Sequence, residues 1–347
     1  MKKFILLGII ILSFLIQAES LTNQGIKYYK NNDYKRAEEY FLKGIEKNEK
    51  NSFFALGTLY QEQKKYDKAE QMYLKAIENG FGMIAFNNLG YLYYKQGKYD
   101  KAEYMYMKAL EEGDTPFNNL GLLYEKQKKY DKAEEYFLKA IQNGDNAFYN
   151  LGVFYDGQQK YDKAEQIFFK ALEFGDKRAF NNLGILYSKQ QKYDKAEQMF
   201  LRAIENGNTN AMYNLGNLYY LYYNKEDKAI EIYRKGHAEG SSHATYSLAI
   251  LENNKGNKKE AEKLLKMCAE KGNLECQESY GEILTENNQK EEGLEWFKKA
   301  AEQKDSISMF KAMYYYYEKN DEVEVKKWAR KILNEKGILN LNYKIQN

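Results

Sequence analysis

The chain has 347 residues, with 53 lysines and arginines, 50 aspartates and glutamates, and a formal net charge of +3. This near balance argues against a nucleic-acid binder, which normally carries a strongly basic face. A single proline, abundant Lys, Glu, Ala, Leu and Tyr, and no strand-type alternation indicate an all-α chain.

The first 18 residues have the pattern of a secretory signal peptide. Met1-Lys2-Lys3 is basic, residues 4–16 are uncharged and mostly apolar, and Ala18 is a small residue suited to cleavage. The apolar run is short for a membrane span, and an uncleaved membrane anchor is the alternative. No cysteine follows the run, which argues against a lipoprotein. We expect a secreted or periplasmic protein whose mature chain starts at Glu19 and has no membrane span.

Residues 19–336 are predicted to form a tandem array of about ten units. A recurring Leu-Gly marks most units, and the motif Tyr-Asp-Lys-Ala-Glu starts at positions 66, 99, 130, 161 and 193. The glycine of Leu-Gly, or the small residue at its place, recurs at intervals of 31 to 33 residues. These positions are Gly25, Gly57, Gly90, Gly121, Gly152, Gly184, Gly216, Ala249, Gly281 and Ala312. This period replaces the two or three domains that length alone would predict. Residues 337–347 follow as a tail without a repeat match.

Each unit encodes two helices, and the third unit shows the pattern. One face of the first helix carries Phe86, Leu89, Gly90 and Tyr93, and residues 95–98 form the turn. Gly90 lets the paired helix approach closely. Asp100 and Glu103 have the spacing of a capping box, so Asp100 is expected to start the second helix. The second helix buries Ala102, Tyr106 and Ala109, and Gly113 follows in the position of a C-cap.

Aromatic residues recur at fixed places in the units, so most of the 34 tyrosines are interpreted as structural. Two runs depart from the pattern, at 219–223 (Tyr-Tyr-Leu-Tyr-Tyr) and at 314–317 (four tyrosines). Consecutive helix positions cannot all face a core, so some of these rings must point outward. They form either a partner surface or local packing at the turn.

The unit resembles the tetratricopeptide repeat. The third unit matches the characteristic positions of that family in order. The family's aromatic is Phe86, its Leu-Gly is Leu89-Gly90, and its Tyr, Ala, Tyr and Ala are Tyr93, Ala102, Tyr106 and Ala109. The closing proline of the family is absent and the period is short, and the pattern Ala203 to Gly207 with Leu215-Gly216 resembles the Sel-one-like branch instead. The resemblance implies a right-handed α-solenoid of helix-turn-helix repeats that binds a protein or peptide partner and has no catalytic activity.

In the tetratricopeptide geometry, the two residues before Leu-Gly and those one and four after the glycine face the concave side. These positions predict partner-binding residues at Asn87, Tyr91, Tyr94, Asn118, Tyr149, Asn181, Tyr213, Asn217 and Tyr220. Asn amides can bond an extended peptide backbone, and tyrosines supply flat contact area. The second Asn of each pair has an alternative role, which is to bond neighbouring helices.

The two cysteines, Cys268 and Cys276, lie at a junction where secreted Sel-one-like proteins carry disulfides. The resemblance therefore implies a disulfide, with two buried thiols as the alternative. Too few histidines and cysteines are present for a metal site, and no cofactor is expected.

The favoured function is an interaction scaffold of the cell envelope. An enzyme acting on cell-wall or β-lactam substrates is disfavoured, because the S-x-x-K and K-T-G motifs of that chemistry are missing and no catalytic residue is predicted. A passive structural spacer is the third possibility.

Overall fold

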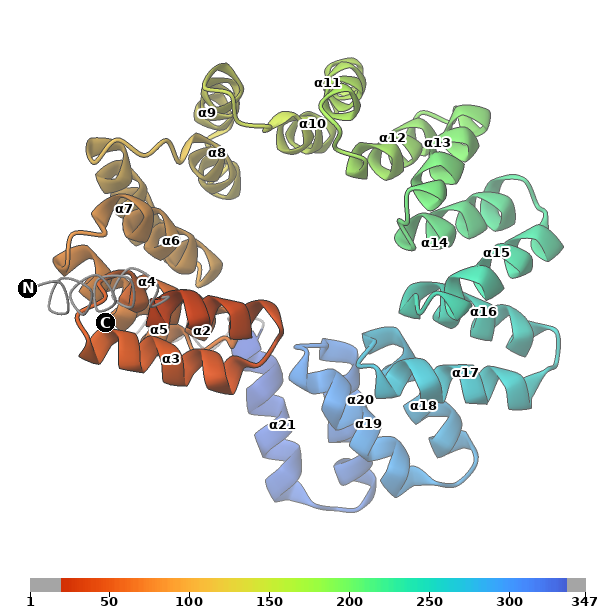
Figure 1. Cartoon of the computed structure of the whole chain (residues 1–347). Helices are drawn as coiled ribbons and strands as arrows, with labels where there is room; N and C mark the ends of the chain where they lie inside the picture. The colour runs from red at the N-terminus through yellow and green to blue at the C-terminus, as the bar shows by residue number, and fades with distance from the viewer. Residues whose placement is uncertain (1–19, 336–347) are drawn as a thin grey trace, which may run out of the picture. The chain divides into compact units, whose positions relative to one another are not determined.

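The computed structural model describes residues 20–335 and contains, within them, twenty α-helices, one π-helix and no strand (Figure 1). The chain divides into two compact units, residues 1–174 and 175–347. The predicted signal peptide (1–18) and the predicted tail (337–347) lie outside the described residues.

Unit one contains five helix pairs, each joined by a short turn. They are α2 (Leu21–Lys30) with α3 (Tyr34–Glu46), α4 (Asn51–Glu62) with α5 (Tyr66–Glu78), α6 (Gly82–Lys95) with α7 (Tyr99–Glu111), α8 (Phe117–Lys126) with α9 (Tyr130–Gln142), and α10 (Phe148–Gly157) with α11 (Tyr161–Glu173).

Unit two contains five further pairs. They are α12 (Arg178–Lys189) with α13 (Tyr193–Glu205), α14 (Asn210–Asn217) and π-helix η1 (Leu218–Tyr222) with α15 (Glu226–Ala238), α16 (Ser242–Asn254) with α17 (Lys258–Glu270), α18 (Leu274–Glu286) with α19 (Lys290–Glu302), and α20 (Ser306–Glu318) with α21 (Glu322–Glu335). The prediction of an all-α helical repeat solenoid of about ten helix pairs is confirmed.

The predicted packing inside the pair α6–α7 is also confirmed, and the pair α8–α9 repeats it. Ala102, Tyr106 and Ala109 are fully buried on α7. A Cβ atom at Gly90 would lie 2.7 Å from the Tyr106 ring, and one at Gly121 would lie 2.6 Å from the Phe137 ring. No side chain fits in that space, so glycine lets the large residue of the second helix lie directly on the backbone of the first.

The predicted capping box is wrong. Helix α7 begins at Tyr99, its N-cap is Lys98, and no side chain caps it. Asp100 lies in the first turn, where a carboxylate favourably meets the helix dipole. The carboxylate of Glu103 is used elsewhere, because Tyr124 of the next pair donates its hydroxyl to it at 2.8 Å.

The last pair differs in register from the prediction. Asn273 caps α18 by accepting from the Cys276 amide, and Asp305 caps α20 by accepting from the Ser308 amide, 32 residues later. Counting from the cap, the position of Gly281 in α18 corresponds to Met313 in α20. The assignment of Ala312 to that position is therefore wrong by one residue.

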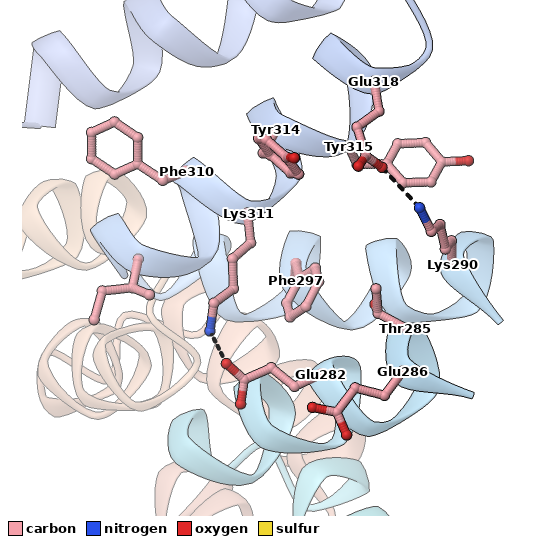
Figure 2. Close-up of a pocket in the computed structure, with 11 residues that line it drawn as sticks. Glu282, Thr285, Glu286, Lys290, Phe297, Phe310, Lys311, Tyr314, Tyr315 and Glu318 are labelled. Atoms are coloured by element: carbon pink, nitrogen blue, oxygen red, sulfur yellow. Dashed lines mark hydrogen bonds and ion pairs between the residues drawn. The ribbon is translucent and has the colours of Figure 1, made fainter. Parts of the chain in front are cut away.

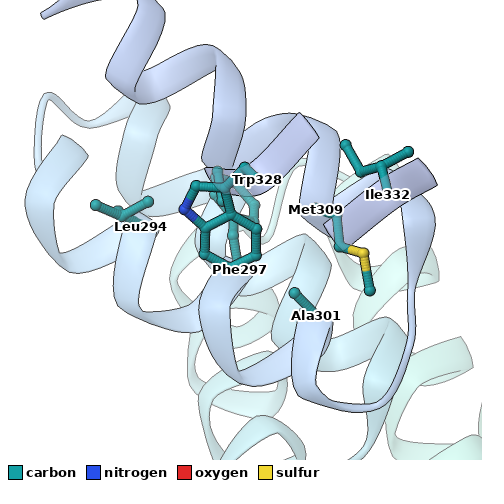
Figure 3. Packing of buried hydrophobic residues seen from close by; sticks show 7 residues of the cluster. Leu294, Phe297, Ala301, Met309, Trp328 and Ile332 are labelled. Carbon is teal, nitrogen blue, oxygen red and sulfur yellow. The ribbon is translucent and has the colours of Figure 1, made fainter. Parts of the chain in front are cut away.

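The C-terminal core closes the second unit. Leu294, Phe297 and Ala301 of α19 pack with Met309 and Ala312 of α20 and with Trp328 and Ile332 of α21 (Figure 3). The packing holds α20 between its two neighbours and leaves its opposite face outside the core.

Candidate functional site

Buried tyrosines join several helix pairs to the preceding pair. The tyrosine hydroxyl on the first helix of a pair donates to a glutamate on the second helix of the pair before it, at 2.7 to 2.8 Å throughout unit one. The pairs are Tyr60–Glu38, Tyr93–Glu70, Tyr124–Glu103, Tyr155–Glu134 and, in unit two, Tyr219–Glu197. Lysines of the repeated motif lie over the same rings, as Lys132 does 5.1 Å from the centre of the Tyr124 ring.

These tyrosines predict a loss of stability at alkaline pH. Burial, reinforced by the hydrogen bond to the Glu38 carboxylate, raises the pKa of Tyr60 to about 12, against about 10 in an unfolded chain. The resulting stabilisation is complete below pH 10 and is lost as pH rises from about 10 through 12. Melting temperature measured across this range should fall. The melting temperature of the triple variant Tyr93→Phe, Tyr124→Phe and Tyr155→Phe should fall less steeply with pH. An equal slope in the variant and the unchanged protein would contradict the explanation.

The predicted asparagines form amide ladders within each unit. Asn119 Nδ2 donates to Asn87 Oδ1 at 2.8 Å, and Asn150 Nδ2 donates to Asn118 Oδ1 at 2.9 Å. In unit two, Asn214 Nδ2 donates to Asn181 Oδ1 at 2.9 Å. The second Asn of a pair therefore bonds the neighbouring first helix, as the alternative interpretation held.

The first Asn of each pair is anchored through its oxygen. Asn87 also donates its Nδ2 to Asp114 at 2.9 Å, whereas the Nδ2 groups of Asn118 and Asn181 have no hydrogen-bond partner among the described residues. Asn87 and Asn118 line one polar cavity of about 380 Å³ together with Asn119 and Asp114. The ladder thus holds amide N–H groups in fixed orientations.

The predicted tyrosines lie half-buried beside the ladders. Tyr91 and Tyr94 stack with centroids 6.2 Å apart, and Tyr213 packs on the ring of His243 at 5.5 Å. Tyr149 is also half-buried. Asn217 accepts a hydrogen bond from the Tyr233 hydroxyl, so its oxygen is engaged in the core. Tyr220 is 37% exposed.

The first aromatic run contains an inserted residue. Seventeen residues lead from Gly216 to Tyr233, against sixteen from Gly184 to Phe200, and η1 accommodates the difference. Tyr222 stacks on Tyr193 with centroids 4.6 Å apart, and Tyr223 donates to Asp194 at 2.7 Å. Local packing therefore explains these two rings, although half of the Tyr222 surface stays exposed.

The second aromatic run belongs to a pocket that the sequence analysis missed. We call it the aromatic pocket; it has a volume of about 480 Å³ and lies on α18, α19 and α20 (Figure 2). Phe310 and Tyr314 line it together with Glu282 and Lys311. With Met313 in the glycine position, Phe310, Lys311 and Tyr314 correspond to Asn118, Asn119 and Leu122 of α8. The one-residue error in register hid this correspondence.

No group of three His, Cys, Asp or Glu within residues 20–335 could hold a metal ion. His237 contacts the Thr245 hydroxyl and His243 packs on Tyr213. None of the helices in this part of the chain is long and apolar enough to cross a membrane.

Five stretches of the chain match models of the tetratricopeptide repeat family. Residues 84–112, 116–143 and 178–206 match one model, and residues 50–79 and 145–174 match a second. The chain contains tetratricopeptide repeats. The Asn87–Asn119 contact joins two of the matched repeats, whereas the aromatic pocket lies outside the matched stretches.

Several solved structures are similar to this tetratricopeptide repeat chain. A Sel1 repeat protein from Oxalobacter formigenes is 27% identical, with 63% of this chain and 97% of that chain covered and a TM-score of 0.47. A protective antigen of uropathogenic Escherichia coli displaying an SLR fold is 23% identical, with 92% and 78% covered and a TM-score of 0.45. A tetratricopeptide repeat protein from Parabacteroides merdae is 22% identical, with 72% and 90% covered and a TM-score of 0.43. A search of curated proteins found no match.

Proposed function

We propose that this tetratricopeptide repeat chain is a non-catalytic scaffold of the cell envelope that binds an extended peptide or a helix of a partner protein in the concave groove. The observation that carries the proposal is the anchored asparagine. Because Asn150 and Asn214 hold the oxygens of Asn118 and Asn181, the free Nδ2 groups are oriented before a ligand arrives. Pre-oriented donors lower the entropy cost of binding a peptide backbone.

Tyrosine rings beside the ladders supply the second element of recognition. Tyr91 and Tyr94 present a stacked pair next to Asn87 on α6, and Tyr213 lies next to the ladder residue Asn214 on α14. Half-buried aromatic rings give large contact area at low entropy cost. None of the predicted partner-binding residues is a lysine or an arginine that would clamp a carboxylate, so the ligand contacts are expected to come from a peptide backbone and apolar side chains.

The binding test uses Asn118→Asp with Asn181→Asp. Each aspartate can still accept from Asn150 or Asn214, so the ladder and the fold should be kept while the free donors are lost. Full-length protein is crosslinked to an envelope fraction, and captured proteins are identified. We expect the variant to capture at least about tenfold less partner, as for the loss of one or two good hydrogen bonds.

The matched control is Asn51→Asp with Asn210→Asp. Each change lies at the first residue of a first helix, so the control adds the same two negative charges outside the ladder. It should capture the partner as the unchanged protein does. Equal capture by the test variant would show that the ladder is not the binding surface. Capture of nothing by the unchanged protein would favour a passive spacer.

Export and disulfide formation belong to the same proposal. The Cα atoms of Cys268 and Cys276 lie 5.8 Å apart, a separation suited to a disulfide, and this distance supports the proposal. Protein released from the envelope should have an intact mass that starts at Glu19, and it should take up no alkylating reagent when denatured without reduction. A full-length mass would support the membrane anchor, and two alkylated thiols would contradict the disulfide.

A further inference from the structure

One buried tyrosine hydroxyl of unit one lacks a hydrogen bond that its counterpart in the preceding helix pair makes. In the pair α4–α5, the Tyr73 hydroxyl donates to Gln61 at 3.2 Å and lies 3.4 Å from the Thr58 hydroxyl. Tyr106 holds the same position in the pair α6–α7, and its side chain is fully buried. Its hydroxyl oxygen has no hydrogen-bond partner within residues 20–335. A buried polar group without a partner calls for an explanation.

The difference comes from the first helix of each pair. Thr58 and Gln61 lie one and four residues after the glycine of Leu-Gly in α4, and Tyr91 and Tyr94 hold the same two positions in α6. The two rings are half-buried, stack with centroids 6.2 Å apart, and give the Tyr106 hydroxyl no hydrogen bond. The pair α6–α7 therefore gives up a core hydrogen bond where it presents two tyrosine rings, and such a departure from the pattern is typical of a binding site.

A half-buried carboxylate lies beside these rings on the next first helix. The bond from Asn119 to Asn87 places α8 next to α6. Tyr94 and Glu125 each lie seven residues, or about two turns, after the first Asn on their own helix, so they occupy matching places on adjacent helices. The negative charge of Glu125 adds to burial in raising the pKa of Tyr94.

The Glu125 carboxylate has no hydrogen-bond or ion-pair partner within residues 20–335. Burial raises the pKa of Glu125, and the attraction of the neighbouring Lys126 offsets this only in part. The glutamates of the tyrosine–glutamate contacts differ in this respect, because Glu103 and Glu134 each accept a hydrogen bond from a tyrosine hydroxyl. A cation beside Glu125 would supply the partner that its carboxylate lacks.

We propose that Tyr91, Tyr94 and Glu125 bind an arginine side chain of the partner peptide. We call these three residues the tyrosine–carboxylate site. The inference rests on the proposed function, because it adds one charged contact to the peptide bound in the groove. A planar guanidinium stacks on tyrosine rings and donates to a carboxylate, so it meets both parts of the site. Lys95 already lies over the Tyr91 ring at 5.8 Å, whereas the Tyr94 ring has no cation over it among the described residues.

A peptide array probed with the full-length protein tests the proposal. The array carries acetylated and amidated octapeptides of varied sequence, each arginine peptide having a copy with citrulline, the neutral isostere of arginine. The best arginine peptide should bind at least about tenfold more tightly than its citrulline copy, because cation–π attraction and a charge-assisted hydrogen bond are lost together. If no peptide binds, the proposed function and this inference both fail. Binding that does not distinguish arginine from citrulline overturns this inference alone.

A charge-removing variant locates the arginine on the protein. Glu125→Gln keeps the size of the side chain and removes its charge, so it should lose most of the preference for the arginine peptide over its citrulline copy. The matched control is Glu173→Gln, which removes the same charge from an exposed residue at the end of α11 and should keep the preference. An unchanged preference in Glu125→Gln would overturn the proposal, because the peptide would then bind elsewhere.

A second variant copies the preceding helix pair. Tyr91→Thr with Tyr94→Gln places the residues of α4 on α6, which gives the Tyr106 hydroxyl the two partners that Tyr73 has. Circular dichroism should therefore show a folded protein, while the arginine preference should fall. A folded variant that keeps the full arginine preference would also overturn the proposal.

Discussion

Replacing Phe137 with alanine should lower the free energy of unfolding by about 3–5 kcal/mol, the range for large buried aromatic residues. The Phe137 ring is fully buried, lies on the backbone at Gly121, and packs on Phe154 of the next pair with centroids 5.7 Å apart. The cavity therefore weakens both the pair α8–α9 and its junction with α10. Urea unfolding followed by circular dichroism measures the effect.

The control for this variant is the neighbouring residue. Leu138 is 40% exposed on the same helix, and Leu138→Ala should cost less than about 1 kcal/mol. If Phe137→Ala shifts the urea midpoint no more than Leu138→Ala, the packing of the ring on the glycine backbone does not stabilise the fold. Midpoints are compared because long repeat arrays depart from two-state unfolding.

Replacing Gly121 with alanine should destabilise the protein by about 1–3 kcal/mol through overpacking, because the new methyl group would lie 2.6 Å from the Phe137 ring. Gly157→Ala is the matched control. Gly157 ends α10, and a Cβ atom there meets nothing within 4 Å. The control should therefore stabilise by up to about 1 kcal/mol through the better helix propensity of alanine. The two changes have opposite expected signs, and a destabilising Gly157→Ala would contradict the explanation.

The double variant Gly121→Ala with Phe137→Ala separates crowding from propensity. The added methyl group then enters space that the ring has vacated. The double variant should be less destabilised than the sum of the single changes, because the two sites share one contact. Additive costs would mean that Gly121 and Phe137 act independently.

Contacts inside one helix pair could be predicted from the sequence. Gly121 and Phe137 are sixteen residues apart in one repeated unit, so their recurrence indicates a glycine facing a large ring. The buried stripe of Ala102, Tyr106 and Ala109 follows in the same way from helical spacing. These positions repeat with little change, so the recurrence of the same residue type indicates its place in the packing of each pair.

Contacts between pairs could not be predicted in this way. Glu103 has the spacing of a local capping residue. Nothing within one repeat shows that its partner is Tyr124 of the next repeat. The sequence placed the asparagines on the first helices, and their role in binding a partner stays a prediction. The ladder contact between Asn87 and Asn119 could not be predicted, because it joins two different repeats. The aromatic pocket was missed because the last repeat lacks the Leu-Gly marker. Its register follows from the caps at Asn273 and Asp305.

The tyrosine–glutamate contacts of unit one give its helix pairs a direction. The three middle pairs of unit one each donate a tyrosine hydroxyl to the pair before and accept with a glutamate carboxylate from the pair after, as Tyr93 and Glu103 do for the pair α6–α7. Each pair is thus a building block with complementary ends. Loss of the block α6–α7 would leave Tyr124 facing Glu70 in place of Glu103, with no unmatched group at the join. Copy number can therefore change by whole units, and the near-verbatim motifs at 66, 99, 130 and 161 are what such duplication would leave behind.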